Sequence, residues 1–357
     1  MPVGAFCAFS GSFRSVRYFA PFLGHAQKMA LILAKLLLLF FKICCILQNE
    51  SLYHLHLQFK YQERANIMAN YSPLRYPGGK SRLADFVSLS IEKAGISGCT
   101  YIEPFAGGAG VGLSLLLKGK VGHVVINDYD KAVYSFWRAV KEEPNALIRK
   151  IEETPITIQE WNTQREIFRN SRSYSLDLAF ATLFLNRTNR SGILSAGPIG
   201  GYAQDGDWKL DVRFDKEAIV GKIVSIAKLK SQITVYNKDI ISFLRRYANK
   251  SKPPRFFYFD PPYYNKGQQL YKNFFTHDDH EKIRNEITTR IMDPWIITYD
   301  DVSEISSLYS AYYMRKFDLT YSAANKGKAS EIMIFSDEKC CPSDTQLIER
   351  KITISLR

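Results

Sequence analysis

Four consecutive residues, Asp260-Pro261-Pro262-Tyr263, directly follow an apolar run at residues 256–259. Each proline fixes its own φ and lacks an N–H, so we expect the loop to be stiff. The carboxylate of Asp260 and the carbonyl of Pro261 then provide two neighbouring acceptors, which suit an exocyclic amine carrying two hydrogens. Tyr263 can stack on the ring that bears this amine. The alternative is a proline-stiffened turn with a buried aromatic side chain.

A glycine-rich turn at residues 103–110, E-P-F-A-G-G-A-G, follows a predicted strand that ends near Ile102. Glycines let a backbone turn tightly and approach a ligand closely. Asp128 comes 18 residues after this turn, just past a second apolar run at 121–126. In nucleotide-type pockets an acidic residue at this position accepts hydrogen bonds from ribose hydroxyls. The alternative is a turn carboxylate that caps the next helix.

Strands and helices alternate around both motifs, which predicts an α/β fold with an open parallel sheet. The middle of the chain is less regular, with a polar stretch at 186–201 that predicts loops and turns. From hydrophobic spacing we expect helices at 83–91, 133–140, 175–185, 215–230 and 277–291. We expect strands to end near Ile102 and to cover 121–126, 233–236, 256–259, 295–299 and 331–335.

The chain has 357 residues and a net charge of +13, and its 46% hydrophobic and 23% charged residues are typical of a globular protein. Residues 149–255 contain 19 Lys and Arg against 11 Asp and Glu, a net charge of +8. Concentrated positive charge attracts polyanions, so a nucleic acid is the first partner to consider. A solvated basic surface is the alternative.

Six cysteines in this length do not make a disulfide scaffold, and none are spaced C-x-x-C. No zinc site is therefore expected, and a reduced, cytoplasmic setting fits this cysteine usage.

The first 67 residues differ from the rest, with seven basic residues and two acidic ones. An apolar run at 29–47 is broken by Lys35 and Lys42. A lysine near the centre of a bilayer costs about 2.5–3.5 kcal/mol, so membrane association is disfavoured, although an anchor stays open. We expect 1–67 to be an atypical leader outside the functional protein, with Met68 as the start of the globular part.

The chain resembles the Dam-type, alpha-class, adenine-specific DNA methyltransferases. The resemblance is carried by Y-P-G-G-K at 76–80, the turn at 103–110 and D-P-P-Y at 260–263, in the order found in that family. It implies a Rossmann-like, S-adenosylmethionine-dependent methyltransferase sheet with an inserted, mainly helical target-recognition domain. The catalytic domain would comprise 68–148 and 256–357, and the basic insertion would comprise 149–255.

The resemblance also implies the reaction, a methyl transfer from S-adenosylmethionine to the N6 amine of an adenine flipped out of double-stranded DNA, without a metal. Asp260, Pro261 and Tyr263 would be catalytic. The cofactor would contact Tyr76, Lys80, Phe105, Gly107, Asp128, Asp239 and Asp260.

A fourth stretch, 186–192, resembles the N-R-x-x-x-x-G segment beside the family's recognition region. Asparagine suits adenine edges and arginine suits guanine or phosphate, so we expect DNA contacts here, with phosphate contact alone as the alternative for each arginine. The expected DNA-binding residues are Asn186, Arg187, Asn189 and Arg190. A cognate restriction endonuclease as a partner stays open. So do an RNA or protein amine methyltransferase and a catalytically inactive DNA-binding relative.

Overall fold

The computed structural model describes residues 71–75, 80–247, 254–265, 275–320, 328–354 and 356–357. All of these lie in the second of the two units into which the chain divides, Met1–Lys60 and Tyr61–Arg357. The predicted leader and the predicted cofactor residue Tyr76 therefore lie outside the described residues. Among the described helices, none is both long enough and apolar enough to cross a bilayer.

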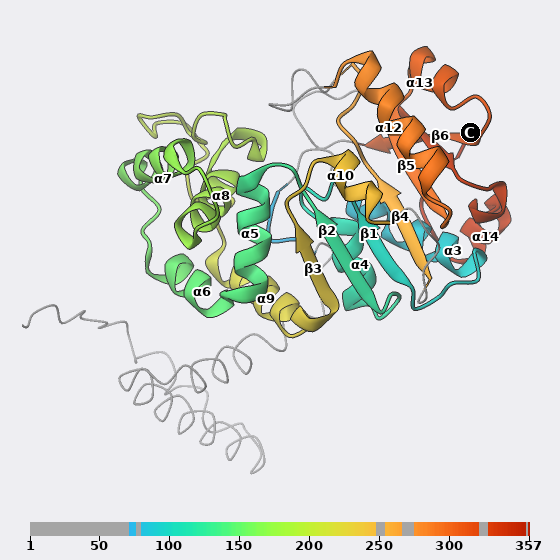
Figure 1. The fold of residues 1–357 in the computed structure, drawn as a ribbon. Coiled ribbons are helices and arrows are strands. Elements are labelled where there is room, and N and C mark those ends of the chain that lie inside the picture. Colours follow the sequence, from blue (N-terminus) through green and yellow to red (C-terminus); the bar gives the residue numbers. More distant parts are fainter. Residues whose placement is uncertain (1–70, 76–79, 248–253, 266–274, 321–327, 355) are drawn as a thin grey trace, which may run out of the picture. The chain divides into compact units, whose positions relative to one another are not determined.

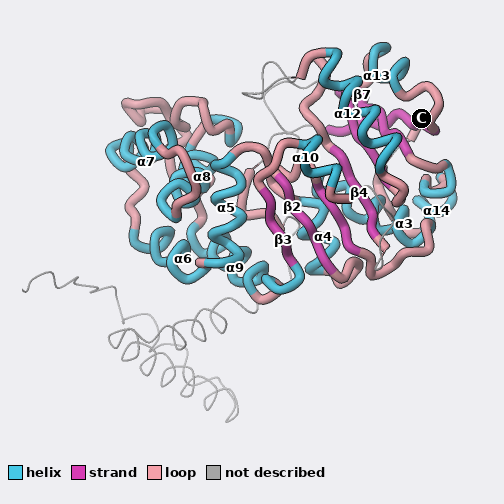
Figure 2. The backbone as a smooth tube through the Cα atoms, viewed as in Figure 1, coloured by secondary structure: helices cyan, strands magenta, loops and turns pink. Residues whose placement is uncertain are grey.

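Seven strands form one sheet in the order β3-β2-β1-β4-β5-β7-β6 (Figures 1 and 2). The pairs among the first five strands are parallel, whereas β7 lies antiparallel to both β5 and β6. This topology confirms the predicted α/β, Rossmann-like fold class. The strands are β1 (Thr100–Glu103), β2 (His123–Asn127), β3 (Ile233–Tyr236), β4 (Arg255–Phe259), β5 (Trp295–Asp300), β6 (Tyr313–Thr320) and β7 (Lys328–Phe335).

The two central strands β4 and β5 are buried at every residue. Their sequences, R-F-F-Y-F and W-I-I-T-Y-D, are rich in the aromatic and β-branched residues that pack well on a pleated surface. Near-continuous apolar runs are typical of parallel strands covered on both faces. The order in which successive strands join the sheet reverses between β1 and β4, since β2 and β3 lie on one side of β1 and β4 and β5 on the other, and open α/β sheets bind their ligands at such a switch point.

Helices cover both faces of the sheet (Figure 1). One face packs against α10 (Ile240–Arg245), α12 (His277–Arg290) and α13 (Ser303–Leu308), which share a core cluster with β4 and β5. On the other face lie α3 (Ala84–Lys93) and α4 (Gly110–Leu117). Gly112 of α4 lies so close to β1 and β2 that an added Cβ would come within 3.1 Å of Tyr101 and Val124. This glycine lets α4 pack close against the sheet.

The segment between β2 and β3 is helical, as predicted for the insertion (Figure 2). Its α8 continues through Thr188, so the predicted loop at 186–201 begins later than expected. β3 and α10 also fall within the predicted insertion at 149–255, yet β3 pairs with β2 and α10 packs on the sheet. The sheet therefore resumes before residue 255. The helices are α5 (Lys131–Glu142), α6 (Pro144–Glu153), α7 (Ile158–Asn170), α8 (Leu176–Thr188) and α9 (Lys216–Ala227).

Short 3-10 helices and one further helix complete the described chain. They are η3 (Lys80–Leu83), η4 (Arg190–Gly192), η5 (Lys230–Gln232), η6 (Glu338–Cys340) and α14 (Asp344–Glu349).

Candidate active site

Acidic side chains stand at the carboxyl ends of four neighbouring parallel strands. Glu103 ends β1, Asp128 follows β2, Asp260 follows β4 and Asp300 ends β5. Because the carboxyl ends of parallel strands meet at one edge, the sheet brings these carboxylates to the edge where such folds bind ligands.

The glycine turn after β1 is tied to the end of β2. The backbone N–H of Gly107 donates to Oδ2 of Asp128 at 2.8 Å, and the carbonyl of Gly107 accepts from the indole Nε1 of Trp137 at 2.8 Å. Gly107 has φ 46° and Ala109 has φ 47°, so the turn passes twice through the left-handed region. Burial raises the pKa of Asp128 to about 7, and the N–H donors of Asp130 and Gly107 oppose this. The structure thus brings together two predicted cofactor residues.

Glu103 is a residue of this edge that sequence reasoning did not single out. Its Oε1 accepts from the Tyr101 hydroxyl at 2.9 Å and from the N–H of Gly112 at 3.0 Å. Its Oε2 is buried without a hydrogen-bond partner among the described residues. Burial raises the pKa of Glu103 to about 7. The available signal was its position as the last residue of an apolar strand before the glycine turn.

A buried asparagine connects three loops at the same edge. The amide nitrogen of Asn127, at the end of β2, donates to the carbonyl of Pro104 at 3.0 Å and to that of Lys238 at 3.1 Å. Its oxygen accepts from the N–H of Lys238 at 3.0 Å. The loops after β1, β2 and β3 are therefore held together by one side chain.

Phe105 in the first loop is half-buried and meets Phe275 edge-on, with ring centroids 6.1 Å apart.

Asp260 is fixed by the strand next to its own. Its Oδ1 accepts from the hydroxyl of Thr298 on β5 at 2.8 Å. The Asp260 side chain is 26% exposed, so it remains accessible, whereas Pro261 is buried. Burial raises the pKa of Asp260, and the ammonium of Lys80 opposes that rise. The predicted catalytic carboxylate therefore lies within reach of a ligand at the strand edge.

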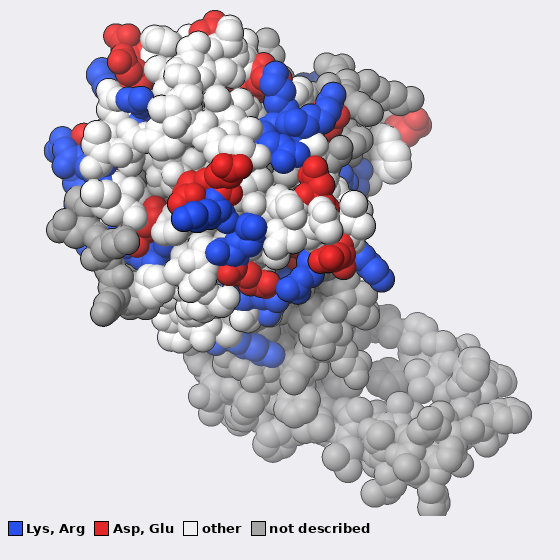
Figure 3. Space-filling model, turned by 90° about the vertical axis from the view of Figure 1, so that its right-hand side faces the viewer, with Lys and Arg blue, Asp and Glu red and all other residues white. Residues whose placement is uncertain are grey.

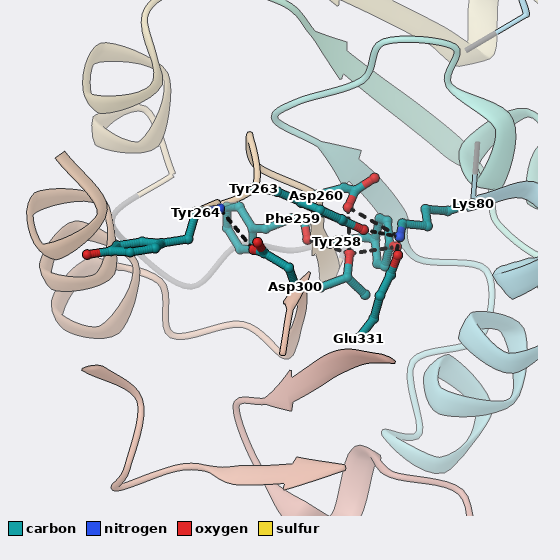
Figure 4. A network of polar contacts seen from close by, with 9 residues as sticks. Lys80, Tyr258, Phe259, Asp260, Tyr263, Tyr264, Asp300 and Glu331 are labelled. Carbon is teal, nitrogen blue, oxygen red and sulfur yellow. Dashed lines mark hydrogen bonds and ion pairs between the residues drawn. The ribbon is translucent and has the colours of Figure 1, made fainter. Parts of the chain in front are cut away.

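Lys80 lies beside the D-P-P-Y motif (Figure 4). Its buried Nζ contacts the hydroxyl of Tyr263 and Oε2 of Glu331, and it is 4.0 Å from Oδ1 of Asp260. Nζ also lies 5.0 Å from the centroid of the Tyr263 ring, within cation–π range. The structure thus brings together Lys80, Asp260 and Tyr263, three predicted site residues. Glu331, on β7, carried no motif and was missed by sequence reasoning.

Asp300 holds the loop that continues from the D-P-P-Y motif (Figure 4). Its Oδ1 accepts from the N–H of Tyr264 and its Oδ2 from the N–H of Asn265, each at 2.9 Å. Because the Asp300 carboxylate is buried, these two bonds fix the backbone directly after Tyr263.

Asp239 follows β3, at the same edge of the sheet, but its side chain is exposed and caps α10. Its Oδ1 accepts from the N–H of Ser242 at 2.9 Å. Hydrogen bonds from Ser242 hold the pKa of Asp239 below its ordinary value. The structure gives Asp239 a capping role, and its predicted contact with the cofactor stays a prediction.

The four residues predicted to bind DNA divide into three that have structural partners and one that is exposed. Asn186 is buried. Its side-chain oxygen accepts from the N–H of Arg75 and its side-chain nitrogen donates to the carbonyl of Arg75, each at 2.7 Å. Asn189 is buried and accepts from the Trp161 indole at 2.7 Å. Arg187 donates to the carbonyl of Pro73 at 2.7 Å. Asn186 and Arg187 thus bond residues 71–75, outside the insertion, and Asn189 bonds within it. The burial of Asn186 and Asn189 corrects the expectation of direct base contact for these two, whereas half-buried Arg187 stays a predicted DNA contact. Arg190 is exposed.

The hydrogen-bond acceptors at this edge fit S-adenosylmethionine. The molecule carries ribose hydroxyls, an ammonium and a sulfonium, all of which favour carboxylate partners. Glu103 supplies a buried oxygen that has no hydrogen-bond partner within the described ranges, and Asp128 lies against the tight glycine turn. Among the described residues, no three His, Cys, Asp or Glu side chains group so as to hold a metal ion.

Comparisons with known proteins indicate the family of this chain. The family model of the D12 class N6 adenine-specific DNA methyltransferase matches residues 76–323. A curated relative, the Type II methyltransferase M.MjaIII of Methanocaldococcus jannaschii, is 24% identical over 204 residues, which cover 53% of this chain and 68% of the relative.

Solved structures resemble the chain only distantly. The rRNA methyltransferase aviRa from Streptomyces viridochromogenes gives a TM-score of 0.34 at 11% identity, covering 74% of this chain and 88% of that one. Protein LPL1258 from Legionella pneumophila gives a TM-score of 0.30 at 11% identity, covering 78% and 91%. The family model spans more than half of the chain, so the protein belongs to the D12 class N6 adenine-specific DNA methyltransferase family, whose methyl donor is S-adenosylmethionine.

Proposed function

We propose that this DNA methyltransferase transfers a methyl group to the N6 amine of an adenine flipped out of double-stranded DNA, as Dam-type enzymes do. The observation that carries the proposal is the position of Asp260, an accessible carboxylate at the switch-point edge that is fixed by Thr298 and followed by two prolines. Such a group can accept hydrogens from an amine that has entered the site.

The chemistry follows from the weakness of this nucleophile. The lone pair of the adenine amine is delocalised into the ring, so the amine attacks poorly. Asp260 and the carbonyl of Pro261 accept its hydrogens, which localises the lone pair and stabilises the positive charge that develops on nitrogen. The sulfonium of the cofactor supplies an electrophilic methyl group. Lys80, 4.0 Å from Oδ1 of Asp260, favours the ionised carboxylate that this role needs.

Tyr263 is proposed to stack on the flipped base. A base leaves the helix at a cost of a few kcal/mol, and stacking on an aromatic ring offsets part of that cost. The contact of its hydroxyl with Lys80 limits the directions in which the Tyr263 side chain can point, so less conformational entropy is lost when the base arrives.

Asp128 and Gly107 are proposed to hold the nucleoside end of the cofactor, with Lys80 and Phe105 nearer the methyl group. The hydrogen bond between Gly107 and Asp128 supports this arrangement, because it orients the carboxylate at the edge of the sheet. Tyr76 and Asp239 remain predicted contacts.

The helical insertion is proposed to face DNA. Support comes from exposed Arg190, Tyr202 and Trp208, the two aromatic side chains being 58% and 66% exposed, and from a net charge of +3 over residues 149–232, which contain 13 Lys and Arg against 10 Asp and Glu. Arg165 donates to the hydroxyl of Tyr202 at 2.8 Å. The face shown in Figure 3 intermixes basic and acidic side chains.

The test uses purified protein, labelled S-adenosylmethionine and three substrates, namely duplex DNA, RNA and a protein mixture. Label in adenine of the DNA is the expected result. Label in RNA or protein alone would mean that the chemistry serves another amine, and no label in any substrate would leave only a binding role.

A further inference from the structure

Glu331 is a buried acidic residue at the active site to which neither a motif nor the proposed chemistry gives a role. It lies on β7, opposite Asp300 of β5 and Phe317 of β6 in the pairing register. Its side chain is 0% exposed, and its Oε2 contacts Nζ of Lys80 (Figure 4). A fully buried carboxylate is costly unless it is paired, so this pair needs a reason beyond stability.

Of the carboxylates in the described part of the chain, those of Glu331 and Asp260 lie within ion-pair range of Lys80. Its side chain is 4% exposed, so its charge depends on them and not on water. Glu331 is in direct contact, whereas Oδ1 of Asp260 is 4.0 Å away, beyond hydrogen-bond distance. The ammonium therefore stabilises the charge of Asp260 at a distance without occupying its oxygen.

We propose that Glu331 is a positioning residue, which holds the ammonium of Lys80 back from Asp260 so that Asp260 stays available to the target amine. The inference rests on the proposed function, because it assumes that Asp260 accepts hydrogens from that amine. Without the charge of Glu331, the nearest counter-charge for Lys80 among the ion pairs of the described residues is Asp260. A buried ammonium would then close the 4.0 Å gap and compete with the amine for the carboxylate.

The primary test is Glu331→Gln in the full-length protein, assayed with saturating cofactor. This isosteric change removes the charge, and we expect kcat to fall by about tenfold or more, the usual effect of losing a charged hydrogen bond. A kcat of Glu331→Gln within twofold of wild type overturns the proposal.

A direct readout is the crystal structure of Glu331→Gln. We expect the distance between Nζ of Lys80 and Oδ1 of Asp260 to shorten from 4.0 Å to hydrogen-bond length. An unchanged distance contradicts the mechanism whatever the activity. Should Glu331→Gln fold poorly, Glu331→Asp keeps the charge and is expected to retain more kcat per folded molecule than the Gln variant. Equal losses in the two variants overturn the role of charge.

The control is the buried ion pair of Arg255 and Asp293, in which Nη2 and Oδ2 lie 2.6 Å apart. This pair lies where β4 and β5 begin, at the ends of the strands away from Asp260. Asp293→Asn should lower the melting temperature and leave kcat per folded molecule unchanged. The activity of the wild-type protein distinguishes failure of the proposed function from failure of the role proposed for Glu331. If wild type does not methylate DNA, the proposed function fails. If wild type is active and Glu331→Gln is equally active, only the role of Glu331 fails.

Discussion

The hydroxyl of Thr298 donates a 2.8 Å hydrogen bond to Oδ1 of Asp260, joining the middle of β5 to the residue that follows β4. Thr298 is fully buried, and its hydroxyl also lies 3.0 Å from that of Tyr258. The orientation of the proposed catalytic carboxylate is thus set by a neighbouring strand and not by the D-P-P-Y loop alone.

Thr298→Val tests that relationship, because it keeps the side-chain shape and removes the donor. A hydrogen bond to a charged group contributes about 1.5–3 kcal/mol, so we expect kcat to fall by at least about tenfold. Steady-state kinetics at saturating cofactor measure the change. A kcat equal to that of wild type would show that Asp260 does not need this donor.

Asp300→Asn should slow the reaction through the backbone. Asp300 accepts from the N–H groups of both Tyr264 and Asn265, and an amide can accept only one of these bonds well. The loop after Tyr263 would loosen, lowering kcat by about 3- to 30-fold while cofactor affinity stays within about twofold. Asp301→Asn is the matched control, because its carboxylate contacts Lys316 and Ser330 instead. Equal kcat in the two variants would contradict the proposal that Asp300 speeds the reaction by holding the backbone of Tyr264 and Asn265 in place.

Cofactor binding should strengthen as the pH rises from 6 to 8. Burial raises the pKa of Asp128 to about 7, so the free protein holds this carboxyl mostly protonated at pH 6 and mostly ionised at pH 8. The ionised form is the better acceptor for ribose hydroxyls, so linkage predicts about tenfold tighter binding at pH 8. Calorimetric titration measures this ratio. In Asp128→Asn the tenfold difference in cofactor affinity between pH 6 and pH 8 should disappear. If the variant keeps the same ratio of affinities as wild type, Asp128 is not the source of the pH dependence.

Arg190 and Asn189 are neighbours with opposite expected effects. Arg190→Ala should weaken binding of duplex DNA and reduce its salt dependence, because one exposed cation is lost. Asn189→Ala should instead destabilise the fold by about 1–3 kcal/mol, since it leaves the buried indole of Trp161 without its acceptor. DNA titration at two salt concentrations and thermal unfolding separate these effects. A loss of stability in Arg190→Ala together with normal stability and weaker DNA binding in Asn189→Ala would contradict the structure.

The sequence predicted the parts of the site that lie in local motifs. Asp260 and Asp128 stand directly after apolar strands, and a parallel sheet necessarily gathers such residues at one edge. Lys80 stands in the Y-P-G-G-K stretch and was expected from the family resemblance. The alternation of strands and helices followed from periodicity, whereas the helical insertion followed from the resemblance.

The missed residues are those that depend on pairing across the sheet. Thr298, Asp300 and Glu331 lie on β5 and β7, more than 30 residues beyond Asp260, and no motif marks them. Strand β6 was not predicted, because its sequence Y-M-R-K-F-D-L-T mixes charges into the apolar pattern. The asparagines at 186 and 189 were misjudged because a polar side chain in a predicted loop gives no sign of burial.

The most direct test of the account is the amount of N6-methyladenine in duplex DNA after reaction with wild type and with Asp260→Ala. Nucleoside analysis by mass spectrometry measures it, with circular dichroism to confirm that both proteins are folded. We predict N6-methyladenine with wild type and a loss of at least about a thousandfold in rate with Asp260→Ala, an effect the size of removing a preorganised transition-state contact. Near-normal N6-methyladenine from the Asp260→Ala protein would contradict the central claim.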